Sequence, residues 1–299
     1  MSDDVKNIDG VQIPVDPLLQ LKRPARALLG WLSDEQAAHL FHGAQSGVAL
    51  SDSEREFLRV AREHISKRAQ FSENENPISP LPSELDNHIK MLRENPKVKA
   101  SFGEGWDFKL VDISKVRALQ PVVFINEAKQ RVAGARAKDF KALAQITIPI
   151  PSMTKLPAQF DPLRNAWIFG SRNPNLRVAG HFAAEVQPGM TGYGFIVEIA
   201  SSLMQVVKIE NKYVLRDGYH RALGLISAGV SVIPALVREF GPYDDLGLPA
   251  AALLPRQLYM GDRPPIVTDY LDDMVSREIV LPATQRTIVI QGLELSHLG

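Results

Sequence analysis

The chain has 299 residues, of which 34 are basic and 34 acidic, so its formal net charge is zero. A neutral chain lacks the basic excess of a dedicated nucleic-acid binder, which disfavours DNA as a partner. The sequence has no Cys, and this excludes disulfides, thiolate metal sites and cysteine nucleophiles.

The N-terminal sequence MSDDVKNIDGVQIPVDP is acidic and has no apolar segment, so it does not look like a signal peptide. No window approaches the roughly 18 continuous apolar residues of a membrane span. We therefore expect a cytoplasmic protein without a membrane partner.

Helical patterns dominate the first third of the chain. Apolar residues recur at helical spacing from Pro17 onward. Ser33 and Ser51 each begin a capping box ahead of a further helical pattern. A loop rich in Pro and Asn over 72–82 then precedes a helix expected at about 83–93.

Short β-rich runs separated by turn residues follow from about Trp106 to Phe240. Two helical patterns interrupt them, at roughly 127–144 and 220–229. This mixture of separate helices and strands predicts an α+β fold.

We expect three parts. Residues 1–100 would form a helical N-terminal region, 101–240 an α+β core, and 241–299 a C-terminal extension that wraps the core. The extension is loop-rich, with one short helix expected at 268–276 and a last strand at 286–291.

The strongest candidate for a functional site is the stretch at 211–237. The runs QVVKIE and KYVLRD flank Asn211 and predict a β-hairpin. The second strand ends at Asp217 and Gly218, and a helix begins at or just after Tyr219. Gly218 permits a positive φ angle or close approach by a ligand. The first N–H groups of the helix point where an anion would bind.

His220 and Arg221 lie in the first turn of that helix. The planar fork of donors on Arg suits phosphate or carboxylate, and Asp217 can accept a hydrogen bond from a ribose hydroxyl, a water or Arg221 itself. We interpret the turn as an anion cradle. The alternative is structural: Asp217 caps the helix and Arg221 pairs with an acid on a neighbouring strand.

The stretch YVLRDGYHRALGLISAGVSVIPALV resembles the core motif of the ParB/sulfiredoxin-like superfamily. In that motif a strand, an Asp-Gly-His-His-Arg type of turn, a helix ending in Gly and a Pro-containing strand occur together. The resemblance covers about a tenth of the chain. The matching positions are Asp217, Gly218, His220, Arg221, Ala222, Gly229, Ile233, Pro234 and Val237.

This resemblance implies a ParB/sulfiredoxin-like core that binds the phosphates of a nucleotide at the turn. Gly218, Tyr219 and Arg221 would bind the ligand. Asp217 and His220 would be catalytic, with His220 donating or shuttling a proton and Asp217 positioning a hydroxyl or a metal-bound water. The implied cofactor is a nucleoside triphosphate with Mg²⁺, and the implied function is a nucleotide- or phosphate-ligand-binding protein, extending to a phosphotransferase acting on a small molecule.

The sequence departs from the superfamily pattern in three ways. Sulfiredoxins carry a catalytic Cys where Tyr219 stands, so this chain cannot perform their chemistry. No helix-turn-helix pattern follows residue 240, unlike in chromosome-partition proteins, and no carboxylate base can be aligned. Two alternatives stay open: a non-catalytic protein-interaction scaffold with a ParB-like core, and nucleic-acid binding or a nuclease.

Other polar segments are weaker candidates. Arg172 and Arg177 lie in a turn-rich loop over 169–181 and could bring a guanidinium to a bound phosphate, or simply belong to a surface hairpin. The basic pattern over 129–141 is typical of a solvated helix face. The spacing of the seven His residues does not indicate a zinc site. Four carboxylates match no cation-binding loop: Asp262, Asp269, Asp272 and Asp273.

Overall fold

The computed structural model describes residues 5–8, 11–14, 22–43, 47–72, 76–151, 156, 158–171, 175–200, 202–241, 253–282 and 286–292. The chain divides into two compact units, each assembled from separated stretches. Unit 1 comprises Met1–Lys22, Ser152–Ser201 and Pro282–Gly299, and unit 2 comprises Arg23–Pro151 and Ser202–Leu281.

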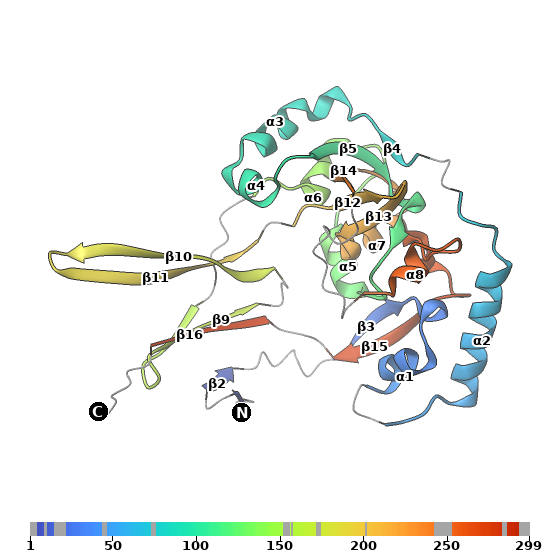
Figure 1. Ribbon diagram of the computed structural model, residues 1–299, viewed down its shortest axis with the longest axis horizontal. Helices are drawn as coiled ribbons and strands as arrows, with labels where there is room; N and C mark the ends of the chain where they lie inside the picture. Colours follow the sequence, from blue (N-terminus) through green and yellow to red (C-terminus); the bar gives the residue numbers. More distant parts are fainter. Residues whose placement is uncertain are drawn as a thin grey trace. The chain divides into compact units, whose positions relative to one another are not determined.

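Unit 2 is built on a mixed six-stranded sheet (Figure 1). Its strands β12 and β13 form the predicted antiparallel hairpin, and β14 runs parallel to β12 on the other side. The strands in spatial order are β4 (Ile78–Ser79), β5 (Trp106–Asp112), β14 (Val232–Phe240), β12 (Gln205–Ile209), β13 (Lys212–Asp217) and β6 (Arg117–Ala118). A second sheet in the order β15-β3-β7 holds β15 (Arg277–Pro282), β3 (Lys22–Ala27) and β7 (Val122–Phe124).

Eight α-helices are described, all in unit 2: α1 (Asp34–His42), α2 (Asp52–Lys67), α3 (Asp86–Glu94), α4 (Pro96–Ser101), α5 (Ile125–Arg131), α6 (Phe140–Thr147), α7 (Tyr219–Ser227) and α8 (Arg256–Tyr259). The 3₁₀ helices with described bounds are η2 (Leu29–Trp31), η3 (Ser83–Leu85), η4 (Ile113–Lys115) and η7 (Val267–Leu271). The capping boxes predicted at Ser33 and Ser51 are confirmed, because each side chain accepts a hydrogen bond from the third residue of its helix. In the part of the chain that is described, no helix is long and apolar enough to cross a membrane.

Apolar residues cover both faces of the six-stranded sheet. Successive residues of a strand point to opposite faces. Ile233 of β14 belongs to the large buried cluster that includes Leu223 of α7 and Ala128 of α5. Leu236 of the same strand belongs to a second cluster with Leu92 of α3. The start of α7 therefore lies over a sheet that is buried on both sides.

Three sequence-based predictions of local structure are wrong. The helical pattern from Pro17 is interrupted by strand β3, in which Ala25 and Ala27 are buried and pair with β7. The expected helix over 127–144 is two helices, α5 and α6, because the chain turns between them. The expected helix at 268–276 is the shorter 3₁₀ helix η7. The strand predicted at 286–291 is confirmed as β16.

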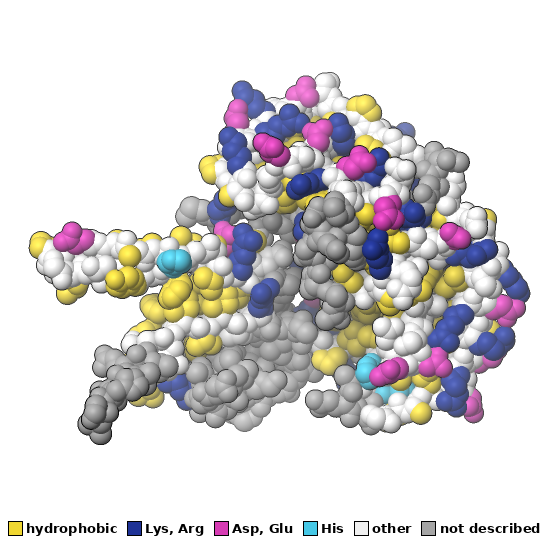
Figure 2. All heavy atoms as spheres, viewed as in Figure 1, with side chains coloured by type: hydrophobic (Ala, Val, Ile, Leu, Met, Phe, Trp, Pro, Cys, Tyr) yellow, Lys and Arg dark blue, Asp and Glu magenta, His cyan; other side chains and the backbone are white. Residues whose placement is uncertain are grey.

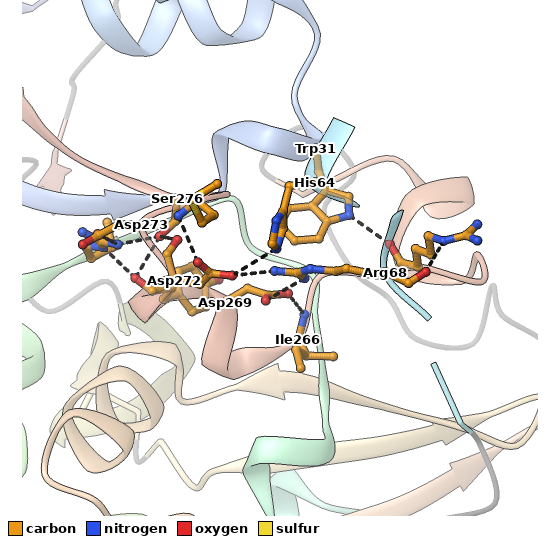
Figure 3. Close-up of polar contacts among 12 residues, drawn as sticks. Trp31, His64, Arg68, Ile266, Asp269, Asp272, Asp273 and Ser276 are labelled. Atoms are coloured by element: carbon orange, nitrogen blue, oxygen red, sulfur yellow. Dashed lines mark hydrogen bonds and ion pairs between the residues drawn. The ribbon is translucent and has the colours of Figure 1, made fainter. Parts of the chain in front are cut away.

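The acidic residues of the C-terminal segment form ion pairs with the N-terminal half of unit 2 (Figure 3). Arg68, which follows α2, donates to Asp269 at 2.8 Å and to Asp272 at 2.7 Å. Burial raises the pKa of Asp269, although the Ile266 N–H and Arg68 act in the opposite direction. These carboxylates are thus engaged by a guanidinium, and the described residues contain no group of three or more His, Asp or Glu side chains that could hold a metal ion.

Unit 1 consists of strands in its described parts. A three-stranded antiparallel sheet has the order β16-β9-β8, with β16 (Arg286–Gln291), β9 (Ala166–Ser171) and β8 (Ala158–Asp161). Two further pairs are β1 (Val5–Ile8) with β2 (Val11–Pro14), and β10 (Leu176–Gln187) with β11 (Met190–Ile199). The predicted division into residues 1–100, 101–240 and 241–299 stays a prediction, and the compact units cut across it.

Replacing Arg68 by Ala should strongly destabilise unit 2. The variant leaves the carboxyl of Asp269, which is only 4% exposed, without its cation, and breaking a buried pair in this way costs on the order of 3 kcal/mol. Arg59→Ala on the exposed face of α2 is the matched control, since exposed pairs contribute less than about 1 kcal/mol. Urea unfolding gives the loss of unfolding free energy in each variant. Equal losses in Arg68→Ala and Arg59→Ala would contradict a stabilising role for the ion pair with Asp269.

Candidate functional site

The backbone between β13 and α7 has the conformation expected of the predicted turn. Strand β13 ends at Asp217, Gly218 has a φ of 105°, and α7 begins at Tyr219 without a side-chain cap. A Cβ atom at Gly218 would lie 2.5 Å from Cγ of the buried Met204. Both the positive φ and the lack of space require glycine here. The uncapped start of α7 leaves its first N–H groups available.

Arg221 turns inward from α7 and binds backbone carbonyls. Its Nη1 donates to the carbonyl of Ser202 at 2.6 Å and to those of Ile146 and Thr147 at 3.2 and 3.3 Å. Its Nη2 donates to Ser202 Oγ at 2.7 Å. The residue is 5% exposed, and burial lowers its pKa to about 10, so it remains a cation at neutral pH. Arg221 thereby fastens α7 to the end of α6 and to the segment before β12.

Asp217 and Arg221 are brought together through one hydroxyl. Ser202 Oγ accepts from Arg221 and donates to Asp217 Oδ2 at 3.0 Å. This arrangement differs from the structural alternative, because among the described residues Asp217 does not cap α7 and Arg221 forms no ion pair with a strand acid. The interpretation of the turn as an anion cradle stays a prediction. Ser202 had no signal in the sequence that could have identified it.

The side chain of Tyr219 is part of the core. Its hydroxyl donates to the carbonyl of Leu215 and accepts from the Leu119 N–H at 2.7 Å. The residue is buried, burial raises its pKa, and its ring makes an edge contact with Tyr270. Only its backbone N–H remains to serve a ligand. The side chain of Tyr219 therefore supports the turn from inside the fold.

His220 has a buried ring nitrogen without a partner. Its ring is parallel to that of Phe124, with centroids 6.3 Å apart. Within the described part of the chain, no group forms a hydrogen bond with Nε2. Burial, and secondly the charge of Arg131, lower the pKa of His220 to about 4. The imidazole is therefore neutral at pH 7 and can donate from one nitrogen.

Two further charged residues of α5 belong to this junction. Glu127 accepts from Arg23 with Oε1, while its buried Oε2 lacks a partner among the residues described. Glu127 lies close enough to His220 to oppose the lowering of its pKa. Arg131, one turn further along, makes no ion pair with any described residue. The sequence showed the one-turn spacing of Glu127 and Arg131, but nothing indicated that α5 packs on α7.

The described residues do not test whether the two predicted arginines converge on the turn. Arg177 belongs to β10 of unit 1, where its guanidinium pairs with Glu198 at 3.0 Å. Arg172 lies outside the described residues. A role for either one at the turn stays a prediction.

Helices α5 and α7 approach each other closely at Gly224. A Cβ atom there would lie 2.4 Å from the backbone oxygen of Ala128. Gly224→Ala should therefore lower the free energy of unfolding by about 1–3 kcal/mol, because backbone atoms cannot move aside as a flexible side chain can. Gly103→Ala is the control, since a Cβ there meets nothing within 4 Å. Chemical denaturation gives the free energy of unfolding of both variants. A Gly224→Ala variant as stable as wild type would contradict the close packing of α5 and α7.

The pKa of His220 predicts a specific acid sensitivity. The unfolded chain binds a proton at His220 near pH 6.5, whereas the folded protein does so only near pH 4. Stability should therefore fall as the pH drops from about 6.5 to 4, by on the order of 3 kcal/mol from this residue. His220→Phe keeps the ring contact with Phe124 and should remove this part of the loss.

The same substitution at the exposed His39 shows what losing an imidazole does by itself. Urea unfolding at pH 7 and pH 4.5 gives the comparison. An identical pH dependence in wild type and His220→Phe would contradict the buried neutral imidazole.

Comparison with protein-family models, with curated proteins and with solved structures finds no match to this chain.

Proposed function

We propose that the chain binds a phosphate-bearing ligand at the start of α7, and that unit 2 contains a ParB/sulfiredoxin-like core. The ligand class proposed first is a nucleoside triphosphate. The order of elements supports the fold proposal: the β12–β13 hairpin leads through the Gly218 turn into α7 and then into β14, parallel to β12. Pro234 of that last strand is the proline of the motif.

The ligand proposal rests on His220 Nε2, a buried atom with no hydrogen-bond partner among the described residues. A buried polar atom without a hydrogen bond is unfavourable, and such atoms are frequently completed by a ligand. A phosphate oxygen at this position would accept from His220 and would be attracted by Arg131. The uncapped N–H groups of α7 would add further donors. The site would thus attract an anion with groups from two helices.

The proposal gives Arg221 a positioning role. Its Nη atoms are occupied by the carbonyls of Ser202, Ile146 and Thr147 and by a hydroxyl. They are not free to bind a phosphate in this arrangement. By fixing the start of α7, Arg221 instead holds His220 where its ring meets α5.

Mg²⁺ fits this site only as a companion of the ligand. Mg²⁺ in nucleotide sites is commonly held by one or two carboxylates together with the phosphates. Asp217 would supply such a carboxylate, since only one of its oxygens has a described hydrogen bond. When bound, the ion would neutralise phosphate charge.

A phosphotransferase would need a base, and Glu127 is placed to be one. Its Oε2 has no described partner, whereas Oε1 is held by Arg23. The acceptor hydroxyl would lose its proton to Oε2 as its oxygen bonds to the terminal phosphorus, and the bond from that phosphorus to the leaving oxygen would break. His220 would hold a phosphate oxygen during the transfer. Transfer extends the proposal, and binding does not depend on it.

A non-catalytic interaction scaffold is the second candidate. One observation favours it: the side chains of Tyr219 and Arg221, both expected to bind ligand, are used inside the fold. A scaffold would retain its partner after replacement of His220 and would show no nucleotide binding.

Calorimetric titration with ATP, CTP, GTP and inorganic triphosphate, each with and without Mg²⁺, tests the proposal. At least one should bind, and Arg131→Gln should weaken that binding by on the order of tenfold or more, as expected for a charge-assisted hydrogen bond. Lys129→Gln is the matched control, because it removes the same charge from an exposed position on the same helix. Equal weakening in both variants would indicate unspecific attraction, and no binding by any of the four ligands would overturn the proposal.

A further inference from the structure

Strands β10 and β11 form a two-stranded ribbon, Leu176–Ile199, with no third strand among those described (Figure 1). The strands have 12 and 10 residues. Each has one edge whose N–H and C=O groups have no partner among the described strands. Isolated two-stranded ribbons are only marginally stable in water. A ribbon of this length therefore calls for a covering partner.

Both faces of the ribbon carry apolar side chains. Directly opposed residues of an antiparallel pair point to the same face. On one face Phe182 lies over Gly194 and Val186 over Gly192, since a Cβ at each glycine would be 2.5 and 2.7 Å from those side chains. On the other face Tyr193 stands opposite Ala183 and Phe195 opposite His181. Neither face is the polar, water-facing side that a hairpin of a monomer normally has.

Large apolar side chains are exposed along the ribbon. Seven of them are between 47% and 83% exposed: Val178, Phe182, Val186, Met190, Tyr193, Phe195 and Ile196. Figure 2 shows hydrophobic side chains along the ribbon and few charged ones. Both faces contribute to this set, so a strand added at the edge of β11 meets apolar neighbours on each face of the enlarged sheet.

The charges of the ribbon allow two identical copies to meet. Between Val178 and Val197 the only Lys, Arg, Asp or Glu is Glu185. At the base, Arg177 and Glu198 neutralise each other in an ion pair. Strand edges that must stay unpaired usually carry Lys or Pro, and neither strand contains either residue. Without a basic cluster the ribbon is also poorly suited to an anionic membrane surface.

The edge of β11 is the better one for pairing. The register shifts of the ribbon both fall at extra residues of β10, between Val178 and Gly180 and between Glu185 and Gln187. Such bulges interrupt the regular spacing of hydrogen-bonding groups, so the edge of β10 is a poor template. Strand β11 runs without an extra residue from Met190 to Ile199.

We propose that the ribbon is the contact surface for a second copy of this chain, with β11 of each copy pairing antiparallel around a twofold axis. The two ribbons then form one four-stranded sheet, and a twofold axis gives each copy the same contacts. With the axis at Gly194, Tyr193 of one copy stands opposite Phe195 of the other, an aromatic pair of the kind that stabilises sheets. The inference is independent of ligand binding, because the ribbon belongs to unit 1 and α7 to unit 2.

Sedimentation velocity on the full chain tests the proposal. Wild type should sediment as a dimer, and Phe195→Lys should sediment as a monomer, because it places two cations next to each other at the twofold axis. Val280→Lys makes the same change at an exposed apolar residue of unit 2 and should remain a dimer. A wild type that sediments as a monomer at the highest soluble concentration would overturn the proposal. Binding of that monomer to vesicles of phosphatidylcholine and phosphatidylserine would then show that the ribbon contacts membranes and not a second copy.

A cross-linking experiment covers the case in which Phe195→Lys fails to fold. The chain has no Cys, so one introduced Cys can cross-link only to another copy. Tyr193→Cys on exposed β11 should give a covalent dimer with a short bis-maleimide, because position 193 is one residue from the proposed axis and its two copies lie about 7 Å apart along the paired strands. Ser53→Cys on exposed α2 should not. Equal cross-linking at both positions, or none at Tyr193→Cys, would contradict the ribbon contact.

Discussion

The turn before α7 depends on one buried cation. Arg221 is almost fully enclosed, and a charge in that environment is tolerated only when it is well hydrogen bonded. Its partners are carbonyls at the end of α6 and before β12, and Ser202 passes the contact on to Asp217. Three segments that are distant in sequence meet at one guanidinium. The position of His220, the adjacent residue in α7, follows from that anchor.

The local chemistry of the turn could be predicted from the sequence because it is local. Gly218 was identifiable from the change of pattern between strand and helix, and the hairpin before it from its alternation around Asn211. The same holds for the helix starts at Ser33 and Ser51, where the cap and its partner are three residues apart. In each case the residues that decide the structure lie within one or two turns of chain.

The directions of the side chains in the turn could not be predicted, because distant segments decide them. Arg221 binds carbonyls some 75 residues away, and its side chain points inward rather than to a ligand. Strand β3 is a second example. Its local sequence favours a helix, but its pairing with β7, about a hundred residues later in the chain, makes it a strand. Arg131 belongs to the pattern over 129–141 that is typical of a solvated helix face, and only the packing of α5 on α7 brings Arg131 and Glu127 to His220.

The electrostatics of the α5–α7 junction links folding to ligand binding. His220 is neutral because it is buried and lies near Arg131, so the free junction holds an uncharged donor beside a cation that forms no ion pair with any described residue. An anion placed there would offset both effects, since it would neutralise Arg131 and favour the protonated imidazole. Ligand binding should then raise the pKa of His220 toward its ordinary value, and proton uptake should accompany binding at slightly acidic pH. His220 Nε2 and Glu127 Oε2, two of the buried atoms without a hydrogen-bond partner among the described residues, would thus be places where a ligand changes the energy of unit 2.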